Sequence, residues 1–203
     1  MNYAAIKKTD VANGPGIRVS LFVSGCTHGC RGCFNQEAWD FSYGEEYTSE
    51  TEAEILKALA PDYIRGLSVL GGEPFEVQNR ETVLALVKKV RERYPGKDIW
   101  CYTGYDYEKD LLEWAAREEE SSEGAGPEMG RRDAVRAVVI KLLGLIDVLV
   151  DGEFVEEKKN LRLAFRGSEN QRLIDVKSSL REGRTVCLEE KGRADAGTEV
   201  NLI

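Results

Sequence analysis

Several features that would support common functions are scarce in this sequence. It contains one histidine, His28, in 203 residues, which nearly excludes metal sites built from several histidines and limits any histidine-dependent triad to that residue. No apolar run approaches the roughly 20 residues that cross a bilayer, and residues 1–10 lack the pattern of a signal peptide. The formal net charge of −8 gives no general attraction to nucleic-acid phosphates. We therefore expect a cytoplasmic protein with no membrane or nucleic-acid partner.

Cysteine is also scarce, but its placement points to a metal site. The chain has five cysteines, and three of them, Cys26, Cys30 and Cys33, fall within eight residues. A secreted disulfide scaffold would spread its cysteines along the chain. Three thiolates in one short loop suit three corners of an iron–sulfur cubane, which ordinarily takes four cysteines, and would leave one iron open to a substrate. The alternative is a Cys3His zinc site, although His28 lies so close to Cys26 and Cys30 that tetrahedral closure is cramped.

Hydrophobic patterns predict strands that alternate with helices. The expected strands are residues 17–23, 67–70, 98–102 and 146–150. The expected helices are residues 48–59, 81–93, 107–117 and 134–143. This alternation predicts an α/β fold with a mostly parallel sheet in one domain over residues 1–180. Two polar stretches fall outside the pattern: residues 118–132, expected to be a mobile insertion, and 181–203, expected to be a loosely held tail.

A short polar or glycine-containing motif follows each predicted strand. In chain order the four motifs are the segment 24–34 with the three cysteines, Gly71-Gly72-Glu73-Pro74, Thr103-Gly104 and Asp151-Gly152. Ligands of parallel sheets bind at the carboxyl ends of the strands, so the shared placement predicts a single site. An ordinary strand-to-loop turn remains open for the glycine motif, as does a capping or turn role for Thr103 and Asp151.

The order of these motifs resembles the radical S-adenosylmethionine (SAM) superfamily. The Cys-x3-Cys-x2-Cys spacing followed by Phe34 is similar to its cluster-binding signature, and the stretch 71–74 is similar to its glycine-rich motif. The resemblance implies a partial (β/α) barrel with a [4Fe–4S] cluster on Cys26, Cys30 and Cys33 at the carboxyl ends of the strands. SAM is the second implied cofactor. The implied SAM contacts are Gly32, Cys33 and Phe34 for the adenosine, Gly71, Gly72 and Glu73 for the methionine amino group, and Thr103 and Asp151 at two other strand ends.

Longer stretches are similar to the activating proteins of anaerobic ribonucleoside-triphosphate reductases. Residues 13–18, Asn-Gly-Pro-Gly-Ile-Arg, resemble activators of glycyl-radical enzymes, and residues 166–172, Arg-Gly-Ser-Glu-Asn-Gln-Arg, resemble the reductase activators. This implies reductive cleavage of SAM and formation of a glycyl radical on the anaerobic (class III) reductase, with flavodoxin or ferredoxin as the electron donor. The alternatives are an activator of another glycyl-radical enzyme such as pyruvate formate-lyase, a small-molecule radical SAM enzyme, and a zinc-binding interaction module.

Other residues have simpler predicted roles. His28 is expected to face solvent, with a hydrogen bond that tunes the cluster as the alternative, and Cys101 is expected to be a core thiol. Cys187 has no predicted role. Three arginines near the end of the domain are expected to form a plain charged face, with a partner-docking surface as the alternative: Arg162, Arg166 and Arg172.

Overall fold

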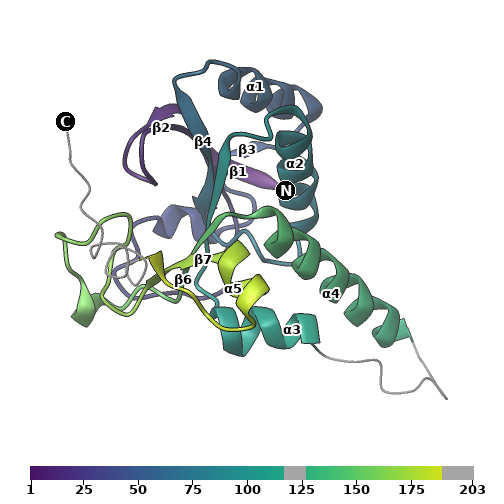
Figure 1. Ribbon diagram of the computed structural model, residues 1–203, viewed down its shortest axis with the longest axis vertical. Helices are drawn as coiled ribbons and strands as arrows, with labels where there is room; N and C mark the ends of the chain where they lie inside the picture. The colour runs from purple at the N-terminus through teal and green to yellow at the C-terminus, as the bar shows by residue number, and fades with distance from the viewer. Residues whose placement is uncertain (117–126, 189–203) are drawn as a thin grey trace.

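A seven-stranded mixed sheet organises the chain. The computed structural model describes residues 1–116 and 127–188. The strand order in the sheet is β3-β1-β2-β4-β5-β6-β7, and α1, α2 and α4 lie along one side of it (Figure 1). No helix in the described parts of the chain combines the length and the apolar character needed to cross a bilayer.

The four central strands are parallel, which confirms the expected α/β fold. They are β2 (Ile17–Val23), β4 (Ile64–Gly71), β5 (Asp98–Tyr102) and β6 (Val148–Asp151), each pairing in parallel with the next. Most of their residues are buried, as expected where helices cover one face of a parallel sheet and side chains fill the other. All four strands therefore end at the same edge of the sheet.

The strands at both ends of the sheet are antiparallel and were not predicted. β1 (Asn2–Asp10) pairs with β2 on one side and with the short β3 (Glu45–Glu46) on the other. β7 (Arg172–Asp175) pairs with β6. The pairing of β1 with β2 contains two register shifts, so its side chains do not follow the clean alternation by which a strand is recognised in a sequence.

Helices connect the parallel strands. They are α1 (Ser49–Leu59), α2 (Arg80–Arg93), α3 (Glu113–Ala116), α4 (Pro127–Leu145) and α5 (Val176–Glu182), with a π-helical turn at Tyr107–Leu112 and 3-10 turns at Gln36–Trp39 and Glu156–Lys158. Thr48 caps α1 in a reciprocal arrangement with Thr51. The buried side of α2, which includes Val83, Leu86 and Val90, joins the main hydrophobic core.

The structure differs from the sequence-based expectation near both polar stretches. The helix predicted at 134–143 begins at Pro127, a residue that suits the first turn because it has no N–H to leave unpaired. Residues 118–126 of the expected insertion lie outside the described residues. The tail, expected to be loosely held, contacts the domain as far as residue 188. The side chain of Val186 is buried, and its carbonyl accepts a hydrogen bond from the Asp175 N–H. The backbone of Cys187 forms an antiparallel β-bridge with Ile174. Residues 189–203 lie outside the described part.

Candidate cluster and cofactor site

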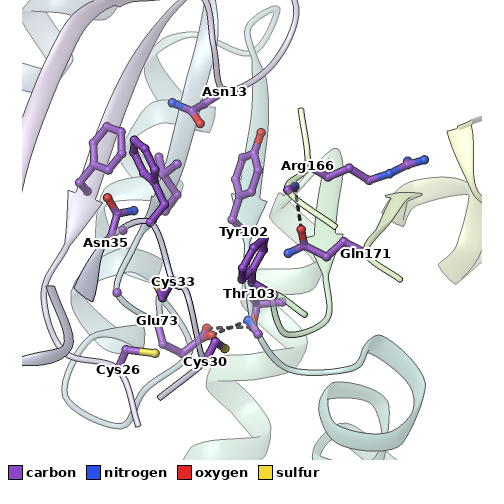
Figure 2. Close-up of a pocket in the computed structure, with 18 of the residues that line it drawn as sticks. Asn13, Cys26, Cys30, Cys33, Asn35, Glu73, Tyr102, Thr103, Arg166 and Gln171 are labelled. Atoms are coloured by element: carbon purple, nitrogen blue, oxygen red, sulfur yellow. Dashed lines mark hydrogen bonds between the residues drawn. The ribbon is translucent and has the colours of Figure 1, made fainter. Parts of the chain in front are cut away.

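The loops at the carboxyl edge of the parallel strands surround a cavity of about 450 Å³. Figure 2 shows Cys26, Cys30 and Glu73 at one end of it and Asn13 and Tyr102 toward the other. The volume lies within the range of small-molecule sites. Eight of the ten residues predicted to bind the cluster or SAM line this cavity: Cys26, Cys30, Cys33, Phe34, Gly71, Gly72, Glu73 and Thr103.

The cysteine loop leaves β2 through a glycine that no other residue can replace without rearrangement. Gly25 has a φ of +96°, and a Cβ atom there would lie 2.1 Å from the ring of Phe41. The Gly25 N–H donates to the Ala38 carbonyl at 2.8 Å, and the Cys26 N–H donates to the Trp39 carbonyl at 3.2 Å. The loop is thereby fixed against the 3-10 turn that follows it, and its first cysteine faces the cavity.

The three loop thiols line the cavity and are open to a ligand bound in it. Each is partly exposed. Burial raises the pKa of Cys26 to about 12, and burial also raises the pKa of Cys30. The thiolate is the form that binds metal, so binding of a metal centre to these thiols must release their protons. The donor set fits a cluster with three cysteine ligands.

The geometry disfavours the zinc alternative. His28 does not face solvent as expected: its Nε2 lies 3.1 Å from Glu73 Oε2, and its Nδ1 lies 2.9 Å from Glu153 Oε1. Both ring nitrogens are therefore engaged by carboxylates. The ligands of one tetrahedral zinc ion lie close together, because Zn–S bonds are about 2.3 Å long. Among the described residues, the sulfurs of the three loop cysteines do not all lie within 4.8 Å of one another.

The side chain of Glu73 links the three loops that follow β2, β4 and β5. Its side chain is 1% exposed. One carboxylate oxygen accepts from the Phe75 N–H at 2.9 Å and the Thr103 hydroxyl at 2.8 Å. The other accepts from the Gly104 N–H at 2.8 Å and faces His28. Four protein groups thus surround the carboxylate that the resemblance assigned to the SAM amino group.

The two glycines before Glu73 are required by close contact between backbones. A Cβ atom on Gly71, whose φ is +112°, would lie 2.6 Å from the Val23 carbonyl oxygen, and one on Gly72 would lie 2.5 Å from the Gly25 carbonyl oxygen. The Gly72 N–H donates to Val23 at 2.7 Å, and the Glu73 N–H donates to Gly25 at 2.8 Å. The glycine motif therefore joins the end of β4 directly to the start of the cysteine loop.

Two predicted SAM contacts do not line the cavity. Gly32 lies against the side chain of Glu156. The buried carboxylate of Asp151 pairs with Arg172 and accepts a hydrogen bond from the Tyr107 N–H at 2.9 Å. Arg172 is accordingly held in a partly exposed ion-pair cluster with Asp151 and Glu108 and does not stand free on the predicted charged face.

Other residues that line the cavity were not among those predicted to bind the cluster or SAM. They include Asn13, Tyr102, Phe154, Phe165 and Gln171. The stretch 166–172 that carried the resemblance has a visible structural role here: the Gln171 amide donates to the Gly152 carbonyl at 3.0 Å, and the Asn170 amide donates to the Glu153 carbonyl at 2.8 Å. These bonds fix the loop after β6 against β7.

Comparison with known proteins agrees with this geometry. Residues 12–174 match the protein family described as a 4Fe-4S single cluster domain. The anaerobic ribonucleoside-triphosphate reductase-activating protein of Vibrio cholerae is 42% identical over 173 residues, which cover 84% of this chain and 96% of that protein. The protein of the same name from Escherichia coli K12 is 38% identical over 173 residues, which cover 84% of this chain and 96% of that protein. The one from enterobacteria phage T4 is also 38% identical over 173 residues, which cover 85% of this chain and 93% of that protein. The chain belongs to the family of anaerobic ribonucleoside-triphosphate reductase-activating proteins, which are radical SAM enzymes with a 4Fe-4S cluster.

Proposed function

We propose that this chain cleaves SAM reductively and generates the glycyl radical of an anaerobic ribonucleoside-triphosphate reductase. The observation that carries the proposal is the convergence of three thiols and the glycine motif on one cavity at the carboxyl edge of the parallel strands. Membership of the family favours the reductase as partner over pyruvate formate-lyase or a small metabolite. The engaged ring of His28 counts against the zinc module.

Cys26, Cys30 and Cys33 are the proposed cluster ligands. Neither of the other two cysteines lines the cavity: Cys101 is buried in the core, and Cys187 pairs with β7. Three ligands leave one iron for SAM. When bound, the reduced cluster would supply one electron to the sulfonium of SAM, which would release methionine and a 5′-deoxyadenosyl radical able to take a hydrogen atom from the target glycine. The chain itself provides orientation and the exclusion of water.

The residues around the cavity have different proposed roles. Gly71, Gly72 and Thr103 are proposed to contact SAM, whereas Glu73 keeps the surrounding loops in register through its hydrogen bonds. Phe34, 94% exposed at the cavity rim, is available to stack on the adenosine. The opposite part of the cavity, near Asn13 and Tyr102, is proposed to receive the glycine-bearing loop of the reductase.

The electron donor is proposed to be a flavodoxin or a ferredoxin, because the cluster chemistry needs a one-electron reductant of low potential. We place the reaction in the cytoplasm, where the reductase substrates and a reducing environment for free thiols are found.

Electron paramagnetic resonance tests the proposed function. The reduced chain is mixed anaerobically with SAM and the reductase, and radical signals are recorded. We expect a glycyl radical on the reductase only when all three are present, and none with the Cys30→Ala variant. Equal radical yields from the wild type and that variant would contradict the proposal, as would consumption of a small-molecule substrate with no protein radical.

A further inference from the structure

The segment after the glycine motif turns underneath the cysteine loop. The Glu76 N–H donates to the Glu73 carbonyl at 3.2 Å, and the Asn79 N–H donates to the Glu76 carbonyl at 2.9 Å. These two consecutive turns each join residues three apart and carry the chain from Glu73 to Asn79. The side chains of Glu76 and Asn79 both reach the cysteine loop, and both are buried, at 8% and 1% exposure.

Glu76 holds the residue that follows the first cysteine. A single carboxylate oxygen, Oε1, accepts from the Thr27 N–H at 3.0 Å and from the Thr27 hydroxyl at 2.5 Å. Hydrogen bonds to an ionised acceptor are stronger than those between neutral groups. The backbone between Cys26 and His28 is therefore fixed from outside the loop.

Asn79 holds the residues that precede the first cysteine. Its amide nitrogen lies 2.9 Å from the Ser24 carbonyl oxygen and 3.4 Å from that of Gly25. The same nitrogen lies 2.9 Å from the carbonyl oxygen of Glu73. One amide group thus ties the start of the cysteine loop to the glycine motif.

The cysteine loop needs such external support. Gly25, Gly29 and Gly32 all have positive φ, and glycine loses more conformational freedom on ordering than any other residue. A cluster with three fixed ligand positions binds most tightly when the loop is already ordered, since ordering costs free energy at the moment of binding. Contacts that order the loop before the cluster arrives would therefore raise its affinity.

We propose that Glu76 and Asn79 form a loop clamp, a pair of positioning residues that orders residues 24–28 and thereby sets the geometry of Cys26 for the cluster. The inference rests on the proposed function for the identity of the bound group. The clamp itself consists of hydrogen bonds within this chain, so it can be tested with and without the cluster.

Hydrogen exchange in the iron-free protein tests the clamp directly. We expect the Thr27 amide to exchange at least about tenfold faster in Glu76→Ala, the factor expected for losing one net hydrogen bond. Glu76→Gln should retain most of the protection, because its amide oxygen can accept both bonds from Thr27. In Asn79→Ala the amides of the glycine motif and of residues 24–27 should exchange faster together. Unchanged exchange in both alanine variants would overturn the clamp.

Reconstitution with iron and sulfide tests the consequence for the cluster. We expect Glu76→Ala and Asn79→Ala to retain several-fold less cluster and to show a changed electron paramagnetic resonance signal on reduction. Ser179→Ala is the matched control, because it removes a buried hydroxyl whose hydrogen bonds go to Asp175 and Val186 and not to the cysteine loop. The comparison is made between variants of equal thermal stability. If Ser179→Ala then lost as much cluster as Glu76→Ala and Asn79→Ala, the positioning role would be wrong. Absence of any cluster in the wild type would instead count against the proposed function, and the exchange result would still decide the clamp.

Discussion

At the scale of single residues, the five cysteines differ in their surroundings. Cys26, Cys30 and Cys33 are partly exposed and line the cavity, whereas Cys101 is buried on β5 in the core and Cys187 lies beside β7. We expect each alanine substitution in the first group to abolish iron binding and SAM cleavage, because two thiolates cannot hold a cluster that keeps one iron free. Cys101→Ala and Cys187→Ala should retain both.

Iron and sulfide analysis of anaerobically purified variants, together with 5′-deoxyadenosine release, measures this division. A cluster in the wild type gives about four iron and four sulfide ions per chain. Loss of the cluster in Cys101→Ala with retention in Cys30→Ala would show that the ligand assignment is wrong.

Glu73 allows a second prediction at this scale. Replacing it with glutamine turns one acceptor oxygen into an NH2 group, a donor that would face donors such as the Gly104 N–H, and a buried donor left unpaired costs about 1–3 kcal/mol. We expect Glu73→Gln to lower the free energy of unfolding by that amount in urea denaturation and to weaken SAM binding. Glu157→Gln, at an exposed side chain, should change stability by less than about 0.5 kcal/mol. Equal effects of the two substitutions would contradict the role of Glu73.

At the scale of elements, the junction between β4 and the cysteine loop depends on Gly72. A Cβ atom there would meet the carbonyl oxygens of Gly25 and Ala38 at 2.5 and 2.9 Å, so the two loops must separate. We expect Gly72→Ala to cost about 1–3 kcal/mol of stability and to reduce SAM affinity. Gly96→Ala has no atom within 4 Å of the added methyl group and should leave both unchanged. Isothermal titration with SAM and urea denaturation give the comparison.

A second junction makes the stability depend on pH. Arg172 on β7 binds Glu108 of the π-helical turn through two bonds, of 2.6 and 3.0 Å, and also pairs with Asp151 at the end of β6. Burial would raise the pKa of Glu108, but its hydrogen bonds with Arg172 and Thr185 outweigh burial and lower the pKa to about 2.

Because the pKa of Glu108 is lower in the folded state, its contribution to stability is complete above the unfolded pKa of about 4.3 and is lost as the pH falls toward 2. We expect the difference in unfolding free energy between the wild type and Glu108→Gln to shrink from pH 6 to pH 3. Urea denaturation at both values measures it. A difference that stays constant over this range would mean that the carboxylate is not stabilised as described.

The elements also show which parts of the structure the sequence encodes locally. The parallel strands β2 and β5 have the predicted bounds, because their apolar runs are short and end at clear turn signals. β1 was missed because only one of its residues is buried and its pairing with β2 contains two register shifts. β7 was missed because it is only four residues long. The motifs at the strand ends were visible for the same local reason, but the clamp of Glu76 and Asn79 was not. Its partners lie about 50 residues away, and nothing in the local pattern specifies that approach.

At the scale of the whole molecule, the cavity spans loops from both halves of the chain. Cys26 and Phe34 line one part, and Phe154, Phe165 and Gln171 line another. A cavity that opens on the protein surface suits a substrate that belongs to a second protein, because the partner's own glycine loop can complete the enclosure and exclude water. We therefore expect SAM cleavage by the chain alone to be slow or uncoupled, and cleavage with the reductase to match radical formation one to one. Product analysis by chromatography beside spin counting measures that ratio.

The central claim is that this chain moves a hydrogen atom from a glycine of the reductase to a SAM-derived radical. The most direct measurement uses reductase deuterated at glycine Cα, incubated with the reduced chain and unlabelled SAM. We predict one deuterium atom in the 5′-deoxyadenosine released, together with a glycyl radical on the reductase by electron paramagnetic resonance. Unlabelled 5′-deoxyadenosine and no radical on the reductase would contradict the claim.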